Sequence, residues 1–184
     1  MILDKVLHKL RTNLIKENIA KDSVVCDLGC GKEVLFLNRL SDKIKYGYGF
    51  DIEASYAKLQ KIETNKIDFE KDNIILKDGV VDIITMFAVL EHLANPEHIV
   101  REAFRVLKAN GTFFLTTPSP KAKNILEFLA FRAGIINKKD ILEHKRYFKP
   151  EEIVGLLKKN GFKEDNIKWR YFELGFNILI SAKK

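Results

Sequence analysis

The sequence predicts an α/β fold: a mainly parallel sheet of seven strands, with helices on both faces and an antiparallel hairpin at the C-terminal end. Strand-like and helix-like segments alternate as far as Thr117, which favours parallel strands joined by crossovers. A glycine-rich turn follows the first strand, at the edge where open α/β sheets bind their ligands. Two β-rich segments with a short link close the chain, as in a hairpin.

The first part of the chain follows this alternation in order. Residues 1–22 carry an amphipathic N-terminal helix, because charges are interleaved with Leu and Ile. Apolar and β-branched runs predict strands at 23–28, 45–51, 65–69, 80–87 and 112–117. Helices are expected at 2–19, 33–40, 53–61 and 96–107. Pro96 suits a first helical position, and Asn110-Gly111 suits a left-handed helix end.

Residues 118–149 interrupt the alternation: a helix is expected at 122–133, followed by a basic loop. Because connections at the carboxyl edge of a sheet carry specificity, this insertion is expected to cover the substrate. A helix then runs from Pro150 to Asn160-Gly161, and the hairpin strands are expected at 166–172 and 176–181. The whole chain, 1–184, is expected to form a single domain.

Composition narrows the class of protein. With 46% hydrophobic and 31% charged residues, the chain has an ordinary globular composition and no apolar run of the ~20 residues that cross a bilayer. The N-terminus does not resemble a signal peptide, so a cytoplasmic location is expected. The net charge of +7 is concentrated in the last third, as scattered lysines that favour a solvated surface over nucleic acid. The cysteines Cys26 and Cys30 are too few for a zinc cluster, and no metal site is predicted.

Acidic residues follow three successive strands of the predicted sheet. Asp27 precedes the glycines Gly29 and Gly31, Asp51 ends the second strand, and Asp68 is followed by Phe69 at the end of the third. Strand ends of a parallel sheet line one crevice, and an acid at the second strand suits ribose hydroxyls. A helix cap for Asp51, and a loop acid beside a core aromatic for Asp68, are the alternatives.

The glycine turn is not that of a dinucleotide site, because Val34 occupies the third position of G-x-G-x-x-G. An acid at the start of the turn also opposes a phosphate. A nucleoside that carries an ammonium group and no phosphate fits better, and S-adenosylmethionine is such a ligand.

These residues resemble those of the class I S-adenosylmethionine-dependent methyltransferases, a family with a Rossmann-like fold. More narrowly, the chain is similar to small stand-alone members with D-x-G-C-G and V-L-E-H motifs. The resemblance lies in the segments VCDLGCG (25–31), GFD (49–51), DGVVDII (78–84), VLEHL (89–93), RVLKANG (105–111) and HKRYF (144–148).

The resemblance implies roles by position for the cofactor-binding residues. Asp27 faces the methionine ammonium, and the Gly29-Cys30-Gly31 turn lies against the methionine moiety. Asp51, followed by Ile52, holds the ribose. Asp68 and Phe69 meet the adenine, and Phe87 lies near the reactive methyl group. The family usually has a further glycine at Glu33, whose side chain either crowds the cofactor or points outward.

The resemblance implies a methyltransferase that acts on a small-molecule acceptor. A hydroxyl or carbon acceptor needs a general base, for which His92, His144 and Glu91 are candidates. His92 is alternatively a packed histidine, and Glu91 a structural residue. Methylation of RNA or protein, and a non-catalytic S-adenosylmethionine-binding protein, remain the alternative functions. The sequence does not indicate an oligomeric state.

Overall fold

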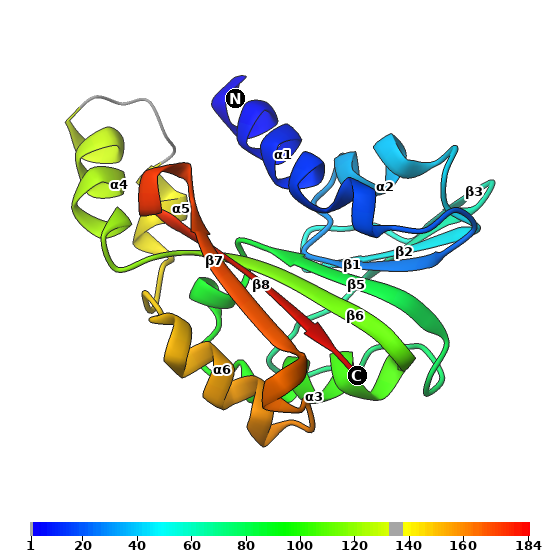
Figure 1. Cartoon of the computed structure of the whole chain (residues 1–184). Coiled ribbons are helices and arrows are strands. Elements are labelled where there is room, and N and C mark those ends of the chain that lie inside the picture. Colours follow the sequence, from blue (N-terminus) through cyan, green and yellow to red (C-terminus); the bar gives the residue numbers. More distant parts are fainter. Residues whose placement is uncertain (1, 133–137) are drawn as a thin grey trace.

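The computed structural model describes residues 2–132 and 138–184, and its strands form one sheet in the order β3-β4-β2-β1-β5-β6-β8-β7 (Figure 1). The strands are β1 (Val24–Leu28), β2 (Tyr46–Asp51), β3 (Ala57–Leu59), β4 (Ile62–Lys66), β5 (Val81–Phe87), β6 (Leu107–Pro118), β7 (Ile167–Phe172) and β8 (Asn177–Lys183). The α-helices are α1 (Ile2–Ile15), α2 (Leu35–Leu40), α3 (Glu97–Val106), α4 (Ala122–Phe131), α5 (Lys138–Leu142) and α6 (Pro150–Lys159). Short 3₁₀ turns are η1 (Lys16–Asn18), η2 (Leu90–His92), η3 (Glu164–Asn166) and η4 (Glu173–Gly175).

The central part of the sheet is parallel, as predicted. β1 pairs with β2 and β5, β2 pairs with β4, and β5 pairs with β6, all in parallel. β8 is antiparallel to both β6 and β7, which confirms the C-terminal hairpin. The carboxyl ends of β1, β2, β4, β5 and β6 therefore lie along one edge, where their loops can form a common site.

Helices cover both faces of the sheet, as expected. α1 and α2 lie on one face, and α3 and α6 on the other, while α4 and α5 lie together beyond one end of the sheet (Figure 1). Phe36 and Leu40 of α2 are buried in one core, and Ile99 of α3 and Ile153 of α6 in the other. Among the described residues, no helix is long and apolar enough to cross a bilayer.

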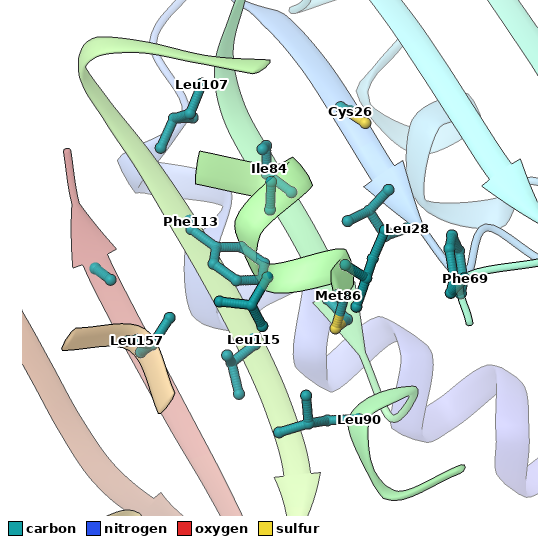
Figure 2. Close-up of a cluster of buried hydrophobic side chains, with 14 of the residues drawn as sticks. Cys26, Leu28, Phe69, Ile84, Met86, Leu90, Leu107, Phe113, Leu115 and Leu157 are labelled. Carbon is teal, nitrogen blue, oxygen red and sulfur yellow. The ribbon is translucent and has the colours of Figure 1, made fainter. Parts of the chain in front are cut away.

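The larger described core lies between the sheet and the α3–α6 layer. Figure 2 shows Leu28 of β1, Met86 of β5 and Leu115 of β6 meeting in this core. On β1 the side chains alternate between the faces, so Cys26 and Leu28 lie in this core while Val25 lies in the other. By the same alternation Asp27 shares the face of Val25 and α2.

The predicted helix at 53–61 is wrong. Residues Ala57–Leu59 instead form β3, which runs antiparallel to β4 through a turn with Gln60 at φ 51°. A helix here would have little to bury, because Ala54 is the only buried residue of the segment. Pairing with β4 gives the backbone hydrogen bonds without an apolar face, and it adds the eighth strand.

Two predicted boundaries also shift. The third expected strand, 65–69, is β4 at Ile62–Lys66, so Asp68 and Phe69 follow the strand rather than end it. The helix expected to reach Asn110-Gly111 ends at Val106, and Asn110 takes a left-handed φ of 65° inside β6. The end of the predicted helix 122–133 and part of the expected lid, residues 133–137, lie outside the described residues.

The crossover from β4 to β5 contains no helix in residues 67–80, all of which are described. Arg105 of α3 fastens it instead: its guanidinium donates to the carbonyls of Ile74 and Leu76 and to the carboxylate of Asp78. Glu102 accepts from the same guanidinium and from the Ile74 N–H at 2.9 Å. The Glu102 side chain is 8% exposed and that of Arg105 is 30% exposed, so the carboxylate is shielded from water while its cation reaches the surface.

We expect Arg105→Met to lower the free energy of unfolding by about 3 kcal/mol, because it leaves the Glu102 carboxylate buried without its cation. Urea denaturation measures the change. The matched control is Arg101→Met on the exposed surface of the same helix, which should change stability by under ~0.5 kcal/mol. If the two substitutions lowered the free energy of unfolding equally, Arg105 would not be the residue that stabilises the crossover.

Candidate functional site

A cleft of about 1250 Å³ opens at the carboxyl edge of the parallel strands. Loops after β1, β2, β4 and β5 form one part of it, and α4 and α5 contribute apolar side chains to another. Nine of the sequence-predicted residues line it: Gly29, Asp51, Ile52, Asp68, Phe69, Phe87, Glu91, His92 and His144. The other predicted residues, Asp27, Cys30 and Gly31, are not among those that line the cleft, although they adjoin Gly29 in the same segment.

The glycine turn is attached to the end of β2 by three backbone donors. The N–H groups of Gly29 and Cys30 donate to the Phe50 carbonyl at 2.8 and 3.2 Å, and the Gly31 N–H donates to Asp51 Oδ2 at 2.9 Å. Gly29 has a left-handed φ of 89°, and a Cβ there would lie 2.2 Å from Val89 Cγ2. Only glycine fits this place, so the turn presents bare backbone to the cleft.

Asp51 both holds the turn and faces the cleft. Its Oδ1 accepts the Glu53 N–H at 2.8 Å, and its Oδ2 accepts from Gly31. A carboxylate has about four acceptor sites. The two that remain can accept from hydroxyl groups of a ligand. Ile52 is 57% exposed beside it and forms part of the rim.

Asp27 lies beneath the turn, with only 3% of its surface exposed. Its Oδ1 accepts a 2.6 Å hydrogen bond from the Thr85 hydroxyl of the neighbouring strand β5. Burial raises the pKa of this carboxyl to about 7, the Thr85 hydrogen bond opposes the rise, and the nearby Asp51 charge adds to it. A cation near this carboxylate would relieve the cost of its charge.

The structure also gives the surroundings of Cys30 and Glu33, the two remaining residues of interest in the glycine loop. Cys30 is buried, and its Sγ would lie 2.9 Å from a Cβ at Gly49 of β2. Burial raises the pKa of this thiol, so it stays protonated. Glu33 is exposed and is not among the cleft-lining residues, so its side chain points outward. The left-handed residue before α2 is Val34, at φ 49°.

Asp68 and Phe69 reach the cleft from the loop after β4. The Asp68 carboxylate accepts from the Glu70 N–H at 3.0 Å and from Lys71 Nζ at 2.8 Å. These hydrogen bonds, with that to Lys71 the larger influence, lower the pKa of this carboxyl. Phe69 is 7% exposed, so one part of its ring belongs to the core and another to the cleft wall.

Glu91, His92 and His144 meet on the other side of β1. The Glu91 carbonyl accepts from the Lys145 and Arg146 N–H groups at 2.9 and 3.3 Å, which fastens residues 144–146 to η2. The His92 and His144 rings then lie 4.8 Å apart, edge to face. Burial, with a smaller effect of His92, lowers the pKa of His144 to about 4, so the imidazole is neutral at pH 7.

Apolar side chains of the insertion line the same cleft as Glu91, His92 and His144. Ile125, Leu126 and Leu129 of α4 and Ile141 and Leu142 of α5 line the cleft. Arg11 of α1 lines it as well, and the sequence analysis did not single out this residue. Its spacing within an amphipathic helix looks like any surface arginine, so no signal in the sequence distinguishes it.

Known proteins resemble this chain in sequence. A sequence model of a methyltransferase domain matches residues 3–166. A ubiquinone biosynthesis O-methyltransferase of Nitrosomonas europaea is 25% identical over 178 residues, which cover 89% of this chain and 75% of that protein.

Solved structures share the fold. A chain of the complex between the Haloferax volcanii Trm112 methyltransferase activator and a methyltransferase superposes with a TM-score of 0.74 at 16% identity, covering 98% of this chain and 90% of that one. A SAM-dependent methyltransferase from Archaeoglobus fulgidus superposes with a TM-score of 0.70 at 17% identity, covering 96% and 94%.

The raised pKa of Asp27 predicts a specific dependence of stability on pH. The folded protein keeps this proton up to about pH 7, whereas the ordinary pKa of the group is 3.8. Between these values the folded state binds more protons than the unfolded state, so this group stabilises the protein less as the pH rises. Asp27→Asn keeps an oxygen that can accept from Thr85 but cannot ionise. Between pH 5 and pH 8, the free energy of unfolding of Asp27→Asn should therefore rise by about 2 kcal/mol relative to that of the wild type.

Urea denaturation of both proteins at several pH values measures this difference. Asp42→Asn, a substitution of an exposed aspartate, is the control and should follow the wild-type profile. Parallel pH profiles of the wild type and Asp27→Asn would show that Asp27 is ionised at no cost in the folded protein.

Proposed function

The chain belongs to the class I S-adenosylmethionine-dependent methyltransferases, and on this premise we propose that it methylates a small, largely apolar acceptor that binds between η2 and the α4–α5 insertion. One observation carries the proposal. A single cleft presents the Asp51 carboxylate on one side of β1, and an apolar wall with two histidines on the other.

The cofactor side of the cleft fits the adenosyl and methionine parts of S-adenosylmethionine. Asp51 has acceptor sites left for the two ribose hydroxyls, and Gly29 leaves the backbone bare for close approach. Asp27, buried with a raised pKa, suits a ligand with an ammonium group. Phe69 and Ile52 offer apolar surface to the adenine. When bound here, S-adenosylmethionine supplies an activated methyl group on a sulfonium.

The acceptor side combines an apolar wall with polar side chains that include Arg11, His92 and His144, and pockets for small molecules join such surfaces. Leu126 and Leu129 of α4 and Ile141 of α5 line it. We assign to residues 118–149 the role of acceptor lid, since the described parts of this insertion supply most of that wall. A largely apolar acceptor that carries one or two polar groups matches these surfaces.

An oxygen acceptor is favoured within this class. The relative from Nitrosomonas europaea is named as an O-methyltransferase of ubiquinone biosynthesis, and it aligns over most of the chain. A hydroxyl is a poor nucleophile until it loses its proton. His92 and His144 lie in the cleft on the acceptor side, and we assign to this pair the activation of that hydroxyl.

Asp51→Asn should weaken the binding of S-adenosylmethionine by about tenfold or more, because an amide cannot accept from both ribose hydroxyls and the Gly31 and Glu53 N–H groups. Isothermal titration calorimetry measures the dissociation constant. The matched control is Glu33→Gln, the same exchange of carboxylate for amide at an exposed residue outside the cleft lining. This control should stay within about threefold of the wild type.

Undiminished affinity of Asp51→Asn would contradict the placement of the ribose, provided that circular dichroism shows the variant to be folded. No binding of S-adenosylmethionine by the wild type at millimolar concentration would reject the proposed function itself.

His92→Gln should lower kcat for a phenolic acceptor by about 10²-fold and leave the affinity for S-adenosylmethionine unchanged. Acceptors are first found by incubating the wild type with methyl-labelled S-adenosylmethionine and a panel of phenols, catechols, amines and thiols. His98→Gln, which replaces a histidine outside the cleft lining, is the control and should keep the wild-type rate. A wild-type rate for His92→Gln would place the proton transfer elsewhere.

A further inference from the structure

We propose that Glu91, His92 and His144 form a binding site for a divalent transition-metal ion on the acceptor side of the cleft. One potential ligand atom from each residue lies within 4.8 Å of the other two. The inference rests on the proposed function, because it assigns to this ion the activation of the acceptor.

A backbone tie and a side-chain ion pair hold the segments of these three side chains together. Glu91 and His92 are adjacent in η2, directly after β5, and His144 comes from the segment before α6. The hydrogen bonds from the Lys145 and Arg146 N–H groups to the Glu91 carbonyl hold that segment in place. A second tie joins Lys145 Nζ to Glu70 Oε1 at 2.9 Å. The cluster therefore depends on fixed backbone, as a ligand site requires.

The Glu91 carboxylate is the strongest indication of a ligand. The residue has 0% of its surface exposed, and its Oε2 accepts from the Thr117 hydroxyl at 2.9 Å. Its Oε1 is buried and has no hydrogen-bond partner in the described structure. Leaving a buried carboxylate oxygen without a partner is costly, and a bound cation would remove that cost.

His144 has an outer hydrogen-bond partner, as metal-ligating histidines do. The Nδ1 of His144 lies 3.1 Å from the Tyr147 hydroxyl, which leaves Nε2 as the coordinating nitrogen. Such an outer partner fixes the ring orientation in metal sites. Ligand atoms of a tetrahedral site stand about 3.4 Å apart at metal–ligand distances near 2.1 Å. The ligand atoms of the cluster lie within 4.8 Å of one another, so ion binding would draw them closer by up to about 1.4 Å.

The ligand set indicates the kind of ion. Magnesium and calcium prefer oxygen ligands, whereas two imidazoles and one carboxylate suit zinc and other first-row transition metals. Three protein ligands leave at least one position open, which is the arrangement of catalytic rather than structural sites. All three residues line the cleft, so an acceptor bound there can reach the open position.

The ion would act on the acceptor hydroxyl. Coordination lowers the pKa of a bound hydroxyl, so that its proton leaves to solvent before methylation. The oxygen lone pair then forms the bond to the methyl carbon, and the carbon–sulfur bonding pair returns to sulfur. An acceptor with two neighbouring oxygens, such as a catechol, would bind the ion most tightly.

Cobalt titration tests the site without any catalytic readout. Protein treated with EDTA should bind one equivalent of Co²⁺ and give a visible absorption spectrum of a nitrogen–oxygen site. His92→Gln and His144→Gln should each weaken binding by about tenfold or more. The control His98→Gln should bind like the wild type. Glu91→Gln extends the series if thermal unfolding shows that it folds.

The outcomes separate this inference from the proposed function. Absence of Co²⁺ binding, or binding that His92→Gln and His144→Gln leave unchanged, overturns the metal site. In the same preparations, calorimetry with S-adenosylmethionine and methyl transfer to the acceptor panel report on the function. If both persist in metal-free protein without stimulation by Zn²⁺ or Co²⁺, the enzyme stands and the metal inference falls.

Discussion

The attachment of the glycine turn to the end of β2 is the constraint on which the site depends. The N–H groups that follow β1 need acceptors, and they find them on the neighbouring parallel strand, at the Phe50 carbonyl and the Asp51 carboxylate. The turn therefore lies flat across two strand ends. Asp51 thus helps to hold the turn and also presents acceptor oxygens to the cleft. The fold of this edge and the surface offered to a ligand therefore depend on the same side chain.

The acceptor side depends on a different tie. The Glu91 carbonyl accepts two N–H groups from residues 145 and 146, and this brings His144 against His92. In the chain, α4 and α5 of the insertion lie between the end of β6 and residues 144–146. Its two ends are thus fixed, at β6 and at residues 144–146, while its helices form the apolar wall. In the proposed function, the β6–α6 connection supplies both the apolar wall and His144, and loops above a rigid sheet commonly carry such roles.

The sequence was a good guide wherever a segment was long and its burial pattern strong. The β-branched run of β5 and the hairpin of β7 and β8 were predicted within two residues. Prediction failed at 53–61 and at 65–69, where short segments have mixed polarity. There the edge pairing of β3 with β4 decided the structure, because partners in a sheet can outweigh a weak local helix preference.

By itself, the sequence determined the mainly parallel sheet, the glycine turn and the positions of Asp27 and Asp51 at strand ends. These follow from local periodicity and chain order, since parallel strands bring their carboxyl ends to one edge. Only the tertiary structure decided that Asp27 is buried against Thr85, that Arg11 reaches the cleft, and that Glu91 and His144 meet. The physical reason is that burial and close approach depend on which distant segments pack together, and spacing along the chain does not encode those distances.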